Sequence, residues 1–186
     1  MTIKAVITVS MILFAVIDII GSIPVIIDIR RKVGTIHPEK VTIVSLIIMI
    51  SFLFLGESIL GFMGIDIPSF AIAGGLVLLF IALEMILGIK IYKDETPATA
   101  SIVPIAFPLI AGAGTMTTLI SLRSKYDAPT IIIGVLLNLV VVYLCLKNLG
   151  FLENLLGAAG IAIIRKVFGF ILLAIAVNLF RSNLGV

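Results

Sequence analysis

Long apolar stretches alternate with short polar segments along the whole chain. The apolar stretches fall at residues 4–28, 41–63, 68–89, 101–122, 129–147 and 161–181. A bilayer core about 30 Å thick is crossed by a helix of roughly 20 apolar residues. The pattern therefore predicts an all-α, polytopic membrane protein with about six transmembrane helices. Because these stretches use up nearly all of the sequence, we expect a single transmembrane domain over residues 1–186.

The composition fits this prediction. Hydrophobic residues make up 61% of the chain and charged residues 12%, whereas soluble domains carry about 25% charged residues. The net charge of +3 does not indicate a nucleic-acid partner, because the basic residues flank the apolar stretches. We expect membrane lipid to surround the protein. The one cysteine, Cys145, lies within an apolar stretch and is interpreted as a packing residue.

The basic residues also predict how the chain is oriented, because cytoplasmic connectors carry an excess of Lys and Arg. With six spans, nine of them share one side: Arg30, Arg31, Lys32, Lys40, Lys90, Lys93, Lys147, Arg165 and Lys166. Four lie on the other side: Lys4, Arg123, Lys125 and Arg181. The first group is therefore predicted to be cytoplasmic, and both termini are predicted to face outside.

A shift of 94 residues reveals weak internal similarity. It aligns Gly75 with Gly169, Leu78 with Leu172, Leu79 with Leu173, Ile81 with Ile175 and Ala82 with Ala176. The same shift sets Asp18 against Gly112. Halves with an odd number of spans insert in opposite directions, which is a common plan of secondary transporters. We therefore expect two inverted three-helix repeats, at about 1–93 and 94–186, with broken first and fourth helices.

The first apolar stretch carries a carboxylate, Asp18, near its middle. A charge there costs about 2.5–3.5 kcal/mol on insertion scales, which indicates a function. Gly21 favours a break in the helix, Ser22 can cap the helix that follows, and Pro24 fits its first turn. We expect two half-helices here, with Asp18 as the ligand of a cation or an ammonium group.

The fourth apolar stretch crowds prolines and glycines between Pro104 and Thr115. Backbone groups freed by a broken helix must be satisfied by neighbouring protein or by a water-filled cavity. If Thr115 caps the second half-helix, its amides form an anion site suited to a carboxylate, lined by Gly112, Gly114 and Thr118. The alternative is that the glycines and prolines only kink or pack the helices.

Three further polar residues are candidates for the pathway. Glu84 and its repeat partner Asn178 end apolar runs, so a snorkelling or interhelical role competes with a pathway role. Asn138 lies in the middle of the fifth stretch, where a hydrogen bond to a neighbouring helix is the alternative to binding a ligand.

Enzymatic motifs are absent from the sequence. His37, the only histidine, lies in a polar connector, so neither a metal-binding histidine pair nor a buried Ser-His dyad can be built. No phosphate-binding loop is present. We expect no enzyme activity, no metal centre and no cofactor, apart from a coupling ion, H⁺ or Na⁺.

These motifs resemble the MarC family of six-helix membrane proteins, which is related to the LysE-type exporters. The resemblance is carried by residues 18–24, 73–82, 104–115 and 165–176. It implies a bacterial or archaeal cytoplasmic membrane and transport of small neutral amino acids. The chain departs from the family pattern at Ile19 and Ala113, which replace proline, and at Ser22, which replaces asparagine. The glycines would then have to break the helices alone.

We therefore expect a secondary transporter of small neutral amino acids such as glycine, alanine or serine, driven by a proton or sodium gradient. The substrate carboxylate would meet the Thr115 end, and Asp18 would bind the ammonium group or the coupling ion beside Gly21 and Ser22. The alternatives are an exporter of amino acids or other small metabolites, and a membrane scaffold or partner subunit. A homo-oligomer is compatible with each.

Overall fold

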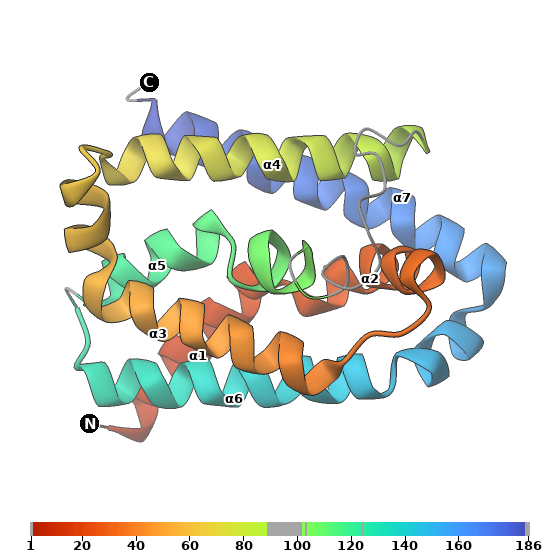
Figure 1. Ribbon diagram of the computed structural model, residues 1–186, viewed down its shortest axis with the longest axis horizontal. Helices are drawn as coiled ribbons and strands as arrows, with labels where there is room; N and C mark the ends of the chain where they lie inside the picture. Colours follow the sequence, from red (N-terminus) through yellow and green to blue (C-terminus); the bar gives the residue numbers. More distant parts are fainter. Residues whose placement is uncertain (1, 89–101, 103, 124, 185–186) are drawn as a thin grey trace.

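The protein is helical throughout the part of the chain that the computed structural model describes, residues 2–88, 102, 104–123 and 125–184. The elements in order are α1 (Ile3–Ile17), α2 (Ile19–Val33), α3 (Pro38–Phe62), α4 (Ile67–Leu87), the π-helix η1 (Ile105–Ile110), α5 (Ala113–Arg123), α6 (Ala128–Lys147) and α7 (Leu149–Asn183) (Figure 1). The predicted all-α class is confirmed for these residues.

Within the described ranges, five segments are long and apolar enough to cross a membrane: Ile3–Arg31, Pro38–Phe62, Ile67–Leu87, Ala128–Lys147 and Ala159–Asn183. They match five of the predicted stretches within a few residues. The remaining stretch, 101–122, contains the short helices η1 and α5. Residues 101 and 103 and the connector at 90–100 lie outside the described residues. The first residues of α1 and the last residues of α7 lie at the same end of the molecule (Figure 1).

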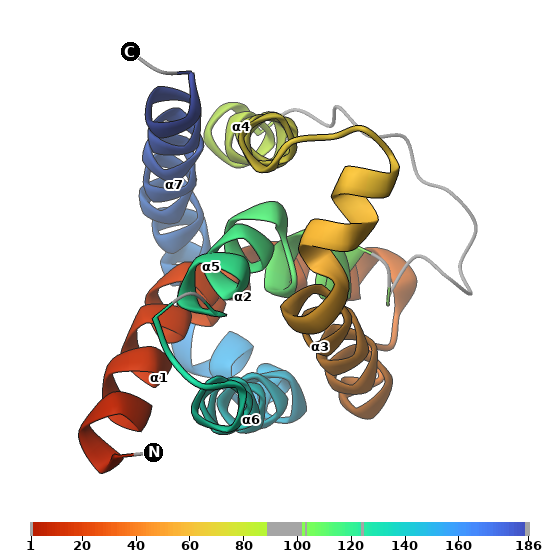
Figure 2. The ribbon, with the colours of Figure 1, turned by 90° about the vertical axis from the view of Figure 1, so that its left-hand side faces the viewer.

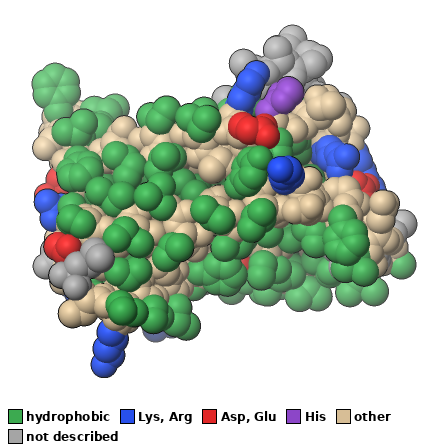
Figure 3. All heavy atoms as spheres, turned by 90° about the horizontal axis from the view of Figure 1, so that it is seen from below, with side chains coloured by type: hydrophobic (Ala, Val, Ile, Leu, Met, Phe, Trp, Pro, Cys, Tyr) green, Lys and Arg blue, Asp and Glu red, His purple; other side chains and the backbone are tan. Residues whose placement is uncertain are grey.

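The exterior is that of a protein in lipid. Large apolar side chains such as Phe62, Leu155 and Ile163 are exposed. Figure 3 shows hydrophobic side chains over much of one face, with charged side chains at its left edge and scattered over its right half. A soluble monomer rarely exposes so continuous an apolar surface, so this surface fits a multi-pass membrane protein.

Proline and glycine set several of the helix limits. Pro38, Pro68 and Pro129 lie in the first turns of α3, α4 and α6, where the missing amide donor costs nothing. Gly34 and Gly88 end α2 and α4 with positive φ angles of 84° and 69°, a conformation that glycine adopts without strain.

Helix α7 is longer than the last predicted stretch. It begins at Leu149 and bends at Gly157, whose φ is 62° and ψ 174°. Arg165 and Lys166, which were counted with the cytoplasmic basic residues although they fall within the last predicted stretch, lie inside α7. The polar pair does not end the helix because Lys and Arg are good helix formers and their long side chains reach polar surroundings.

The broken segments form the centre of the molecule. Helix α4 packs along α7, α1 packs along α6, and α3 contacts both α5 and α6. Seen end-on, α2 and α5 lie between these outer helices (Figure 2). Fully buried residues of the core come from both broken segments, among them Leu13, Ile26, Ile110 and Leu119. The packing therefore holds the two breaks in the protein interior.

Glycines allow α4 and α7 to approach closely. A Cβ on Gly75 would lie 3.3 Å from Leu179 Cβ, and a Cβ on Gly169 would lie 3.1 Å from Met85 Cβ. Both distances are tighter than ordinary contacts between side chains. Gly75 and Gly169 therefore let the two helices pack closely.

Candidate functional site

The first helix break lies at Asp18 itself. Helix α1 ends at Ile17 and α2 begins at Ile19, and Asp18 between them has a left-handed backbone with φ 44°. Aspartate is among the residues that tolerate this conformation. Its Oδ1 accepts a hydrogen bond of 3.2 Å from the Gly21 amide. Asp18 therefore breaks the first span and caps the second half-helix with its own carboxylate.

The predicted break is confirmed, but the structural roles expected of Gly21, Ser22 and Pro24 in it were wrong. Gly21 and Ser22 lie inside α2, and Pro24 lies deeper in the same helix. Ser22 is not the cap, because an aspartate already fills that position. Gly21 serves to make room: a Cβ there would overlap the Asp18 carboxylate and lie 2.6 Å from Phe168 Cδ1. The glycines do not break this helix alone.

The second break lies between η1 and α5, at Ala111 and Gly112. A Cβ on Gly112 would overlap the carbonyl oxygen of Pro108, so only glycine fits there. Thr115 was predicted to cap the second half-helix, and this was wrong. It lies within α5, and its hydroxyl donates a 3.0 Å hydrogen bond to the Ile110 carbonyl. The side chain thus satisfies a carbonyl freed by the break.

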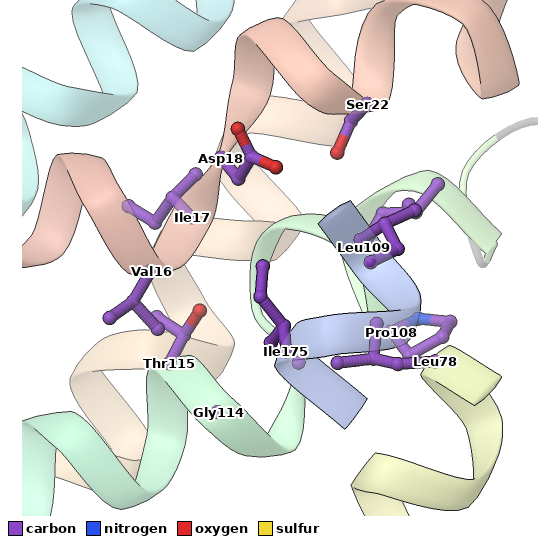
Figure 4. A pocket seen from close by; sticks show the side chains of 12 residues that line it. Val16, Ile17, Asp18, Ser22, Leu78, Pro108, Leu109, Gly114, Thr115 and Ile175 are labelled. Carbon is purple, nitrogen blue, oxygen red and sulfur yellow. The ribbon is translucent and has the colours of Figure 1, made fainter. Parts of the chain in front are cut away.

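A small cavity lies between the two breaks, with a volume of about 30 Å³. Its lining comprises Val16, Ile17, Asp18, Ser22, Leu78, Pro108, Leu109, Gly112, Gly114, Thr115, Leu172 and Ile175. Figure 4 shows the Asp18 carboxylate and the Ser22 hydroxyl turned toward the same space. Such a volume holds about two water molecules. An amino acid is several times larger than water, so the cavity as it stands is too small to hold one.

The cavity contains a buried carboxyl oxygen without a hydrogen-bond partner. Oδ2 of Asp18 is buried and has no hydrogen-bond partner. Ser22 and Thr115 are each only 2% exposed. Burying an unpaired carboxylate oxygen is costly, and a proton or a cation bound to it removes that cost. The site is therefore suited to a positively charged group.

The opposite wall suits a negatively charged group. Gly112 and Gly114, which line the cavity, flank the first residue of α5. The first amides of a helix have no acceptor within it, and the helix dipole places partial positive charge there. The two walls together match a small molecule that carries an ammonium and a carboxylate group.

The other candidate residues lie outside this lining. Thr118 donates a 2.7 Å hydrogen bond to the Gly114 carbonyl, one turn along α5. Asn138 lies on a groove between α1 and α6, and its Nδ2 donates to the carbonyls of Ser10 at 3.0 Å and Gly134 at 2.8 Å. It makes the interhelical hydrogen bond that was considered for it.

Two candidates lie elsewhere on the outer helices. Glu84 is partly buried near the end of α4, and Asn178 is exposed on α7. Neither belongs to the lining of the cavity. Their roles in a pathway stay predictions.

Sequence reasoning missed the apolar lining of the cavity. Leu78 on α4 and Leu172 on α7 line it from opposite halves of the chain. The shift of 94 residues aligns these two leucines, so the signal was present. Phe168, which packs over Gly21 beside the site, carries no comparable signal.

The comparisons with known proteins agree with this architecture. The profile of the MarC family of integral membrane proteins matches residues 3–185. A UPF0056 membrane protein of Methanocaldococcus jannaschii is 32% identical over 92% of this chain and 92% of its own length. A UPF0056 membrane protein of Pyrococcus abyssi is 29% identical over 92% of this chain and 90% of its own length. The protein YhcE of Escherichia coli is 33% identical over 89% and 85%. No solved structure matches the chain significantly.

Proposed function

The chain belongs to the MarC family of integral membrane proteins, and we propose that it is a secondary transporter of small neutral amino acids. The observation that carries the proposal is the cavity between two helix breaks, in which Oδ2 of Asp18 is buried without a partner. Secondary transporters bind substrates and coupling ions at the ends of discontinuous helices near the middle of the membrane. The names of the relatives add only that they are membrane proteins.

We propose further that six crossings form two inverted repeats, with η1 and α5 together making the fourth crossing. Helix contacts occur in pairs that the shift of 94 residues relates, α1 with α6 and η1 with α3, then α2 with α7 and α5 with α4. Gly75 lies against residues 176, 179 and 180, and Gly169 lies against residues 82, 85 and 86, so each neighbour is offset by 94. A twofold relation between the halves accounts for both patterns.

In the proposed mechanism, each wall of the cavity binds one charged end of the substrate. Asp18, with Ser22 beside it, binds the ammonium group or the coupling proton or sodium ion. The amino-terminal end of α5, at Gly114, binds the carboxylate. Leu78 and Leu172 leave room for small side chains only. Rocking of one repeat against the other enlarges the cavity and opens it to each side in turn.

The proposed location is the cytoplasmic membrane of a prokaryote, with both termini outside. The relatives in bacteria and archaea support a prokaryotic membrane. Arg30 and Arg31 of α2 contact Glu153 at the beginning of α7, and this end of the molecule lies away from the chain termini (Figure 1). An excess of basic residues favours the cytoplasmic side for that end.

The test is uptake of radiolabelled glycine and alanine into proteoliposomes under an imposed proton gradient and then a sodium gradient. Asp18→Asn is the informative variant, because asparagine tolerates a left-handed backbone and still accepts a hydrogen bond from the Gly21 amide. It removes only the charge. We expect uptake in the wild type under one gradient and a loss of about tenfold or more in the variant, as for loss of a charged hydrogen bond.

Two results would contradict the proposal. Correctly inserted wild type that takes up neither amino acid under any gradient would remove the substrate assignment. Undiminished uptake by Asp18→Asn would remove Asp18 from the site. The matched control is Glu57→Gln, which neutralises an exposed carboxylate on α3 and should leave uptake unchanged.

A further inference from the structure

The ion pairs among the residues that the structure describes are concentrated on one contact. Arg31 binds Glu153 with Nη2 to Oε1 at 2.8 Å, and Arg165 binds Asp28 with Nη2 to Oδ2 at 2.9 Å. Every ion pair between two residues that the structure describes joins α2 to α7. This contact connects the first half of the chain to the second.

The Asp28–Arg165 pair lies on the line from the cavity to one end of the molecule. Asp28 follows the lining residue Ser22 by six residues, about 9 Å at the helical rise. Arg165 precedes the lining residue Leu172 by seven residues, about 10 Å. Counted from Asp18, Asp28 is about 15 Å along the helix, which is half the thickness of a bilayer core. The pair therefore lies near the membrane surface.

Apolar side chains fill the space between the cavity and this pair. Phe168 packs over Gly21, and Val25 and Phe168 both contact a small apolar cluster that includes Leu172. From the cavity outward, the contact between α2 and α7 thus presents an apolar layer and then an ion pair. In this structure, the apolar layer and the ion pair separate the cavity from this end of the molecule along the contact between α2 and α7.

The repeat counterparts of the pair are apolar. A shift of 94 residues takes Asp28 to Leu122 and takes Arg165 to Ala71. Leu122 is 5% exposed and Ala71 is 1% exposed. The charges are therefore not a requirement of the helix packing, since the related contact between α4 and α5 is closed without them.

The guanidinium of Arg165 is only partly used. One of its Nη atoms binds Asp28, while its Nε is buried and has no partner. Arginine binds a carboxylate best through two parallel N–H groups. The orphaned Nε–H is thus a donor available to a second carboxylate.

We propose that Asp28 and Arg165 form a gate that also binds the substrate, as a zwitterion, on its way to the cavity. The amino acid inserts into the pair, its carboxylate binding Arg165 through Nε and Nη and its ammonium group binding Asp28. No charge is left unpaired when the amino acid replaces the direct contact of Asp28 with Arg165, because the amino acid supplies one positive and one negative group. An amine or a carboxylic acid alone would leave one side chain without a partner, which is costly at a half-buried site. This inference rests on the proposed function.

The gate is tested without any transport assay. Val25→Cys, in a Cys145→Ala background, places one thiol behind the pair, and its reaction with a small methanethiosulfonate is followed in proteoliposomes. Neutralising the pair with Asp28→Asn and Arg165→Gln should raise the labelling rate about fivefold or more. The charge-reversed pair, Asp28→Arg with Arg165→Asp, should bring the rate back toward that of the parent. Glu153→Gln, at the outer end of the same contact, should change it less than twofold.

The zwitterion is tested on the same thiol. Millimolar glycine should speed labelling when the pair is intact and have no effect when it is neutralised, while methylamine and acetate should not speed labelling in either protein. An unchanged rate on neutralisation would overturn the gate. An equal effect of methylamine or acetate would overturn the zwitterion site. Because the neutralised variants are labelled without any amino acid, the gate can stand or fall separately from glycine uptake.

Discussion

The two helix breaks face the same cavity but are built from different chemistry. The first depends on an acidic side chain, Asp18, which adopts a left-handed backbone and caps α2. The second depends on the absence of a side chain at Gly112, beneath the Pro108 carbonyl, and on the Thr115 hydroxyl. One side of the cavity is thus a charged wall, formed by the Asp18 carboxylate, and the other is a backbone wall, formed by the chain at Gly112. The difference provides the site with the polarity that a zwitterion needs.

The backbone wall is the more sensitive to added atoms. Gly112→Ala would drive a Cβ into the Pro108 carbonyl oxygen, and overpacking of this kind costs about 1–3 kcal/mol. We expect a fall of about 2–12 °C in the unfolding temperature of the purified protein in detergent. The unfolding temperature can be measured from the loss of the monodisperse size-exclusion peak after heating.

The matched control lies two residues away. A Cβ on Gly114 would meet Val16 Cγ1 at 3.6 Å, which is an ordinary contact. Gly114→Ala should therefore unfold within about 1–2 °C of the wild type, as for a substitution costing less than about 0.5 kcal/mol. Equal losses in the two variants would mean that the close approach at Gly112 is not what holds the second break.

The contacts that support the two breaks differ as well. A hydrogen bond joins α6 to α1, because the side-chain amide of Asn138 donates to the Ser10 carbonyl. At the second break, the contact of α3 with α5 is apolar at Gly56, which lies against Ile120. Asn138→Leu should lower the free energy of unfolding by about 0.6–1.7 kcal/mol, as for hydrogen bonds between membrane helices. Denaturation by mixed detergent micelles would measure it. Asn178→Leu, at an exposed position on α7, should be neutral.

The smallest effect concerns the exposed caps, one in each half. A hydrogen bond from the Ser69 side chain lowers the pKa of Asp66 below its ordinary value of 3.8, and one from the Thr130 side chain does the same to the pKa of Asp127. A carboxyl group whose pKa is lowered in the folded state stabilises the fold at pH values above its ordinary pKa. This stabilisation is lost as the pH falls through the lowered pKa. Asp66→Asn and Asp127→Asn should each reduce the acid sensitivity of the unfolding temperature below about pH 4. A similar acid profile in wild type and variants would contradict this.

The sequence predicts the spans well because hydrophobicity alone determines them. The broken fourth stretch was also visible, since prolines and glycines crowded into one stretch weaken an ordinary helix in the hydrocarbon core. The atoms that make each break could not be predicted from the sequence. Whether Asp18 or Ser22 caps α2 depends on a backbone angle, and whether Thr115 accepts or donates depends on where the Ile110 carbonyl points. The ion pair of Asp28 and Arg165 joins residues far apart in sequence, and no local pattern encodes it.

The most direct test of the central claim is counterflow of radiolabelled glycine into proteoliposomes that contain unlabelled glycine, with no ion gradient. Counterflow requires one site that opens to each side in turn, so it tests the Asp18 cavity without assuming a coupling ion. The account predicts transient accumulation of label by the wild type and by Glu57→Gln, and a loss of about tenfold or more in Asp18→Asn. Accumulation that is equal in Asp18→Asn, or absent from correctly inserted wild type, would contradict it.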